Sequence, residues 1–148
     1  MADFTAREQL MLELINRARM DPAGEAKRYG ISLNEGLSSG TISSSASQVL
    51  AGNDQLGFAA DKHEQWMFAN NLFSHNESTG SQVYGVSPFD RMHTAGYGYS
   101  AAGESIAWSG STGSIDPTQT LMQLHRNLFV DAGVAGRGHR LNIVNAGW

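Results

Sequence analysis

The first regular pattern of apolar and polar positions predicts an amphipathic helix near the N-terminus. Four apolar residues recur at the i, i+3, i+4, i+7 spacing of one helix face: Met11, Leu14, Ile15 and Ala18. Thr5 stands before this stripe and Glu8 follows it by three residues, which is the spacing of a capping box. We expect the helix to end at Asp21-Pro22, a pair that can also cap another turn.

Three later segments have helical patterns. The first runs from about Phe58 to Leu72, where one face carries these residues: Ala59, His63, Trp66, Met67 and Asn70. The second is short, with Ser87 as N-cap, Pro88 at the first helical position and Gly96 as the stop. The third begins after Asp116 and has a single face made of Leu121, Leu124, His125 and Leu128.

A strand and a long connection complete the predicted elements. The run "GYGYSAAGESIAWSG" alternates apolar and polar residues from about Glu104, which predicts one short strand. Residues 30–53 are rich in serine and glycine, and we interpret residues 34–53 as a surface connection and not as a second domain. The sequence therefore predicts a single domain over residues 1–148.

Composition narrows the possible functions. The chain has 148 residues, 16% charged residues and a net charge of −4, which is typical of a globular protein and argues against nucleic acid as a partner. It contains no cysteine, so any metal would be held by histidines and carboxylates. The N-terminal residues lack the pattern of a secretory signal, and no segment approaches the roughly 20 apolar residues of a transmembrane helix.

Taken one at a time, the histidines give only weak evidence of a metal or binding site. His63-Glu64 begins like a zinc-binding His-Glu-x-x-His helix, but Met67 stands where the second histidine would be. We therefore expect His63 to pack on a helix face, and His93 to be exposed to solvent. His75, Glu104 and His139 each lie in a turn flanked by glycine or serine, where rigid elements present side chains to a cleft.

Four motifs taken together indicate a protein family more specifically than any single residue does. In order they are "LGFAADKHEQWMFANNLFSH", "GVSPFDRMHTAGY", "AGESIAWSG" and "GRGHRLNIVNAGW". This set resembles the bacterial branch of the CAP superfamily, or SCP domains, which includes cysteine-rich secretory proteins, antigen 5 and plant pathogenesis-related class 1 proteins. The resemblance covers about residues 7–148 and implies an α+β fold, an α-β-α sandwich with helices on both faces of a small antiparallel sheet.

The resemblance also implies a site. Its two cleft histidines fall on His75 and His139, and its first cleft acid falls on Glu104, which precedes Ser105 where the family has asparagine. The second acid has no secure match, although His125 or Asp131 could lie in its neighbourhood. The resemblance thus predicts a divalent metal, zinc above all, on His75 and His139 with Glu104 in support, and it implies no organic cofactor.

The end of the chain departs from the family pattern. Two further strands follow the Gly-His-Arg segment in the family, whereas this sequence stops at Trp148. We therefore expect either a fragment of a longer protein with an incomplete sheet, or a sheet in which residues 141–148 and another segment supply the missing pairing. In a fragment, the open sheet edge would give a monomer or a dimer. The resemblance implies an extracellular protein exported without an N-terminal signal peptide, with a cytoplasmic location as the alternative.

Three functions remain open at the level of sequence. The first is a secreted binding module whose cleft takes a metal ion and an extracellular small molecule, lipid, glycan or peptide. The second is a metal-assisted, peptidase-like hydrolase that uses Glu104 as its catalytic base. In the third, the cleft residues form a polar network that only stabilises the fold.

Overall fold

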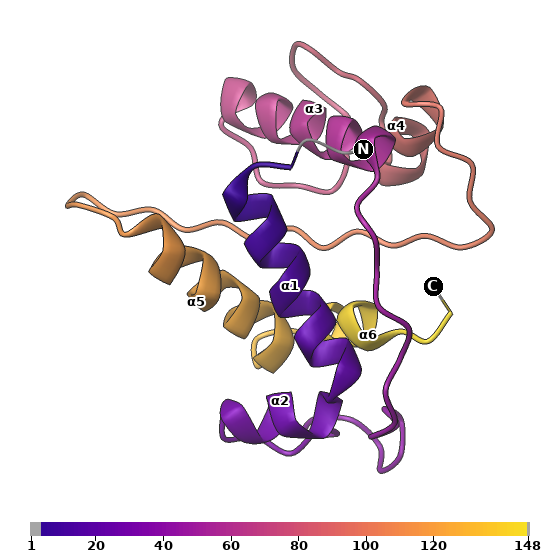
Figure 1. Ribbon diagram of the computed structural model, residues 1–148. Helices are drawn as coiled ribbons and strands as arrows, with labels where there is room; N and C mark the ends of the chain where they lie inside the picture. The colour runs from indigo at the N-terminus through magenta and orange to yellow at the C-terminus, as the bar shows by residue number, and fades with distance from the viewer. Residues whose placement is uncertain (1–3, 148) are drawn as a thin grey trace. The chain divides into compact units, whose positions relative to one another are not determined.

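A computed structural model describes residues 4–147, and over that range α-helix is the only regular secondary structure (Figure 1). Its helices are α1 (Ala6–Met20), α2 (Pro22–Arg28), α3 (Asp54–Asn70), α4 (Pro88–Thr94), α5 (Pro117–Val130) and α6 (Gly138–Val144). The described residues form two compact units. The central unit is Gly52–Ile106, and the terminal unit combines Phe4–Ala51 with the chain from Ala107 onward.

The α+β prediction is wrong for the part of the chain that is described. Residues 4–147 contain no β-strand, so they form neither the α-β-α sandwich nor the incomplete sheet expected of a CAP domain. The strand predicted near Glu104 lies in the long non-helical segment between α4 and α5. The alternation there is real, but a strand is stable only when another strand pairs with its backbone, and no described segment does so. Trp108, at the end of this run, is 70% exposed.

The N-terminal helices are confirmed by their capping contacts. Thr5 and Glu8 form the predicted capping box of α1. Asp21 ends α1, and its carboxylate accepts a hydrogen bond from the backbone N–H of Gly24 at 2.8 Å, so the same residue begins α2. Pro22 occupies the first position of α2, where its missing N–H has no cost. One Asp-Pro pair therefore joins two successive helices.

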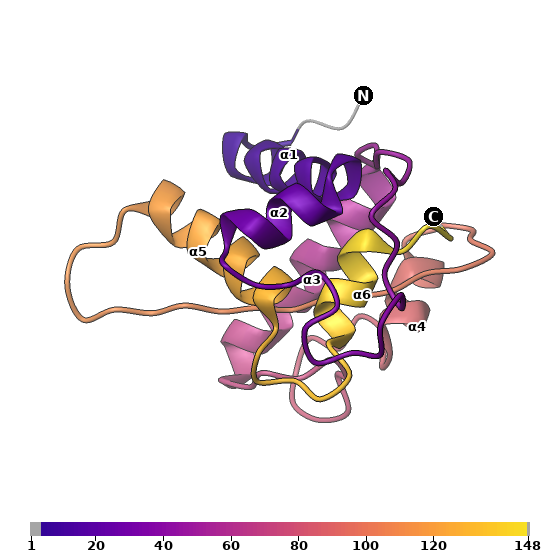
Figure 2. The same ribbon diagram turned by 90° about the horizontal axis from the view of Figure 1, so that it is seen from below.

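The terminal unit has its core where α1, α5 and α6 pack together (Figures 1 and 2). The core residues are Ala18, Ala26, Ile42, Phe129, Ile143 and Val144. The predicted helix after Asp116 is confirmed, and the Asp116 carboxylate accepts hydrogen bonds from the N–H groups of Thr118 and Gln119. The sequence did not reveal α6, because its start lies in a glycine-rich turn and its N-cap, Arg137, makes no side-chain capping contact.

Two buried arginines bond backbone carbonyl groups in the terminal unit. Arg140 on α6 donates to the carbonyl oxygens of Phe129 and Val130 at the end of α5, and to those of Leu33 and Glu35.

Arg19 on α1 makes contacts of the same kind. It donates to the carbonyl oxygens of Gln48, Ile143 and Asn145. The last carbonyls of a helix lack partners within the helix, so these guanidinium groups satisfy helix ends that would otherwise be buried without hydrogen bonds.

The connection before α3 has no helix or strand, but it is held in place at several points. The Asn34 side chain bonds both the N–H and the carbonyl of Ile42, at 2.7 and 3.0 Å. Further along, the N–H of Ser47 donates to the carbonyl of Arg19 at 2.8 Å. The serine-rich stretch is therefore exposed for most of its length, while Ile42 reaches the core.

In the central unit, α3 packs against α4 (Figure 1). Asn53 caps α3 by accepting hydrogen bonds from two backbone N–H groups, so the helix starts four residues before the position predicted from its apolar face. The predicted short helix is confirmed as α4, with Ser87 and Asp90 in a capping box. No helix in the described range is long and apolar enough to cross a bilayer.

Candidate functional site: two exposed histidines oriented by carboxylates

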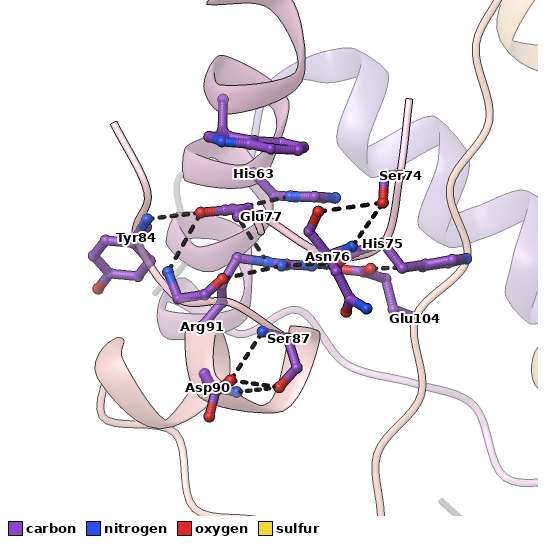
Figure 3. A network of polar contacts seen from close by, with 12 residues as sticks. His63, Ser74, His75, Asn76, Glu77, Tyr84, Ser87, Asp90, Arg91 and Glu104 are labelled. Atoms are coloured by element: carbon purple, nitrogen blue, oxygen red, sulfur yellow. Dashed lines mark hydrogen bonds and ion pairs between the residues drawn. The ribbon is translucent and has the colours of Figure 1, made fainter. Parts of the chain in front are cut away.

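His75 and Glu104 form a contact in the central unit (Figure 3). Nδ1 of His75 lies 2.8 Å from Oε1 of Glu104, although 29 residues separate them in sequence. A neutral His75 with its proton on Nδ1 donates to the carboxylate and leaves the Nε2 lone pair free. The His75 side chain is 46% exposed, and its ring extends away from the network in Figure 3. Nε2 is therefore accessible to a ligand from solvent.

Arg91 holds the other side of Glu104. Its Nη2 donates to Oε2 of Glu104 at 2.6 Å, and its Nη1 donates to the carbonyl oxygen of His75 at 3.0 Å. Both oxygens of Glu104 thus have a donor, and the Glu104 side chain is only 17% exposed. A carboxylate with both oxygens engaged is better suited to orienting a histidine than to taking a proton from water.

Behind this pair lies a buried carboxylate. Glu77 accepts hydrogen bonds from the backbone N–H groups of Tyr84 and Gly85, and its Oε1 lies 2.9 Å from Nδ1 of His63. His63 is buried on α3, as predicted, and stacks on the Trp66 ring. Its Nε2 has no hydrogen-bond partner among residues 4–147. His63 is therefore an interior residue and not a ligand-binding one.

The terminal unit contains a second, partly exposed histidine with the same arrangement. Nδ1 of His139 lies 2.8 Å from Oδ1 of Asp131, and the other oxygen of Asp131 accepts a hydrogen bond from the His139 backbone N–H at 2.9 Å. Asp131 therefore orients the imidazole and also supplies the N-terminal capping contact that Arg137 does not give α6. Asp131 is buried, and the His139 side chain is 25% exposed.

His125 is a buried histidine and takes part in a different cluster. Its Nε2 lies 3.0 Å from Oε1 of Glu25, and Arg17 and Arg28 form ion pairs with the same carboxylate. Burial opposes the charge of Glu25, but hydrogen bonds from His125, Arg17 and Tyr29 outweigh it and hold the pKa of Glu25 well below its usual range. Burial, together with the hydrogen bond to Glu25, raises the pKa of Tyr29 to about 12.

The structure pairs some predicted site residues with each other and others with residues that sequence reasoning missed. It brings His75 to Glu104 and His139 to Asp131, and Ser105 lies partly buried beside Glu104. The shared His75–Glu104–His139 site stays a prediction, because its members belong to two units that are described separately.

Glu25, Glu77 and Arg91 were not predicted. Glu25 and Arg91 carry no local motif that distinguishes them from solvated helix charges. Glu77 lies two residues after His75 among polar residues typical of turns, and this closeness to a predicted site residue was its one sequence signal.

Within either unit, the described side chains supply fewer ligands than a complete metal coordination shell needs. No group of three or more histidine, aspartate or glutamate side chains in residues 4–147 is placed to hold a metal. An imidazole whose Nδ1–H is held by a carboxylate is nevertheless the usual form of a metal-binding histidine. Each exposed histidine thus fits one ligand position of an open site, and neither fits a closed structural site.

The chain matches no protein-family model, no curated protein and no solved structure. The motif resemblance to the CAP superfamily stays a prediction that these comparisons do not test, and the absence of a sheet from residues 4–147 conflicts with the sandwich fold that it implied.

Proposed function

We propose that this protein is a binding module that takes a divalent cation, zinc in the first place, on Nε2 of His75. The observation that supports this is the 2.8 Å contact between His75 Nδ1 and Glu104, which directs the free lone pair of a half-exposed imidazole outward. Zinc binds neutral imidazole readily, and water together with donor groups of a second ligand would complete its coordination.

The charges around His75 also favour a cation. Glu77 and Glu104 carry two negative charges, and Arg91 supplies one positive charge among them. With His63 and His75 neutral, these two carboxylates and one guanidinium give the network as a whole one negative charge. A bound cation would balance it, and acidification would weaken binding because protons compete with the ion for Nε2.

Zinc titration calorimetry tests the proposal. We expect His75→Ala to weaken zinc binding at least about tenfold, since a site with so few protein ligands depends on each of them. His93→Ala is the matched control, because His93 is exposed on α4 and no carboxylate among the described residues hydrogen-bonds to its ring. His139→Ala, measured in the same series, tests the sequence-based prediction that His139 binds the same ion.

Two results would reject the proposal. One is zinc binding by His75→Ala that equals that of the parent protein. The other is a large loss of stability in His75→Ala when zinc leaves the melting temperature of the parent unchanged, which would make His75 a purely structural residue. The hydrolase prediction gains no support from a Glu104 whose two oxygens both have donors.

A further inference from the structure

Arg91 contacts both members of the His75–Glu104 pair (Figure 3). One guanidinium nitrogen bonds the main chain of His75, and a second bonds the carboxylate of Glu104. The Arg91 side chain is only 1% exposed. Because a guanidinium group is planar and its donors have a fixed geometry, these two contacts set the position of Glu104 relative to the backbone that carries the imidazole.

The distances indicate that Arg91 is more than a counter-ion for buried Glu77. Its Nε lies 3.6 Å from Oε1 of Glu77, which is too long for a hydrogen bond. The contacts to Glu104 and to the His75 carbonyl are 2.6 and 3.0 Å. A third hydrogen bond, from Nη1 to the carbonyl oxygen of Gly85, is longer at 3.3 Å. The two shortest contacts of Arg91 therefore go to Glu104 and His75, and the longer ones go to Gly85 and Glu77.

Glu77 provides a fixed base for this arrangement. Its carboxylate is fully buried and is held by His63 and by the N–H groups of Tyr84 and Gly85. These contacts hold the carboxylate in the interior, and its negative charge attracts the Arg91 guanidinium. Polar contacts therefore connect the buried carboxylate of Glu77, through Arg91 and Glu104, to the exposed imidazole of His75.

We infer that Arg91 is the positioning residue of the His75 site and acts by holding Glu104 where it accepts the Nδ1 proton of His75. The identity of the ligand rests on the proposed function above, whereas the positioning of the imidazole does not. Without Arg91, Glu104 is free to turn toward water. His75 then favours the form with its proton on Nε2, as a free imidazole does in water, and loses the lone pair that would bind an ion.

Nitrogen-15 NMR of the full chain, recorded without metal at mildly alkaline pH, tests this directly. In the parent protein we expect neutral His75 with its proton on Nδ1. In Arg91→Lys, whose single ammonium cannot reproduce the two contacts, we expect the proton to move largely to Nε2. The signals of His139 and His93 should not change, which separates repositioning from general loss of structure. A folded Arg91→Lys that keeps the Nδ1–H form of His75 would overturn the inference.

A double variant keeps the test usable if Arg91→Lys does not fold. Glu77→Gln combined with Arg91→Met removes both buried charges, and this avoids the penalty of leaving one of them unpaired. We expect the same shift of the His75 proton to Nε2, and an unchanged Nδ1–H form would again overturn the inference.

Zinc binding separates this inference from the proposed function. We expect Arg91→Lys to weaken zinc affinity by about 10–100-fold, as loss of an outer-shell partner usually does. Absence of zinc binding in the parent protein would reject the proposed function, while the NMR result, obtained without metal, would still decide the role of Arg91. Parent-like zinc affinity in Arg91→Lys would contradict the positioning role.

Discussion

Glu25 on α2 and His125 on α5 are 100 residues apart in sequence, yet Nε2 of His125 lies 3.0 Å from Oε1 of Glu25 in the interior of the terminal unit. Both side chains are almost completely buried, and Arg17 on α1 bonds the same carboxylate at 2.6 Å. One acid therefore links three helices. Because a buried charge without partners is costly, the cluster makes packing of these helices depend on the ionisation of Glu25.

Acidification should destabilise the terminal unit through Glu25. The pKa of Glu25 in the folded protein lies well below its value in the unfolded chain, so its stabilising contribution is complete above the unfolded pKa and is lost as the pH falls. We expect the free energy of unfolding, measured with urea, to decrease below about pH 5. The decrease should be smaller in Glu25→Gln, and equal slopes for both proteins would contradict the prediction. Glu13→Gln, an exposed site on α1, should behave like the parent.

Replacement of Arg140 by lysine should be strongly destabilising. A lysine ammonium cannot reach all four carbonyl oxygens that Arg140 bonds, so buried acceptors at the end of α5 would lose their partners. We expect a loss of at least about 2 kcal/mol in the free energy of unfolding. Arg7→Lys, at an exposed position on α1, should change it by less than about 0.5 kcal/mol. Similar stabilities of the two variants would show that the carbonyl contacts contribute little.

Asp131→Asn should destabilise the N-terminal turn of α6. The aspartate uses its two oxygens for the N–H and for Nδ1 of His139, whereas an asparagine has only one oxygen for both. Asparagine tolerates the left-handed backbone of this position, at φ 51°, so backbone strain does not complicate the comparison. We expect a loss of about 1 kcal/mol and faster hydrogen exchange of α6 amides. Unchanged exchange would argue against the capping role, and Asp61→Asn on the exposed face of α3 is the control.

The two tryptophans of the described range should respond differently to the same substitution. Trp66 is buried, stacks on His63 and donates from Nε1 to the carbonyl of Thr79 at 3.0 Å. Trp66→Phe removes that hydrogen bond and part of the packed volume, for an expected loss of about 2 kcal/mol. Trp108→Phe, at a largely exposed side chain, should change the free energy of unfolding by less than about 0.5 kcal/mol. Equal effects in urea unfolding would contradict the different environments of the two rings.

Local sequence alone was sufficient for most of the helices. The capping residues Thr5, Ser87 and Asp116 and the prolines after two of them correctly mark where α1, α4 and α5 begin. These signals are reliable because a cap satisfies backbone groups within three residues of itself, whatever the rest of the chain does. The packing of His63 on a helix face followed from helical periodicity in the same way, and the expected exposure of His93 is also confirmed.

Tertiary structure decided everything that depends on a distant partner. A strand near Glu104 requires a second strand beside it, and alternation in one segment carries no information about whether that partner exists. The beginning of α6 depends on Asp131, and the partners of His75 and His125 lie 29 and 100 residues away. The sequence thus determined which residues could do chemistry at His75 and His139. Only folding determined that Glu104 and Asp131 would orient them and that Arg91 would hold Glu104, because these contacts join segments that no local pattern relates.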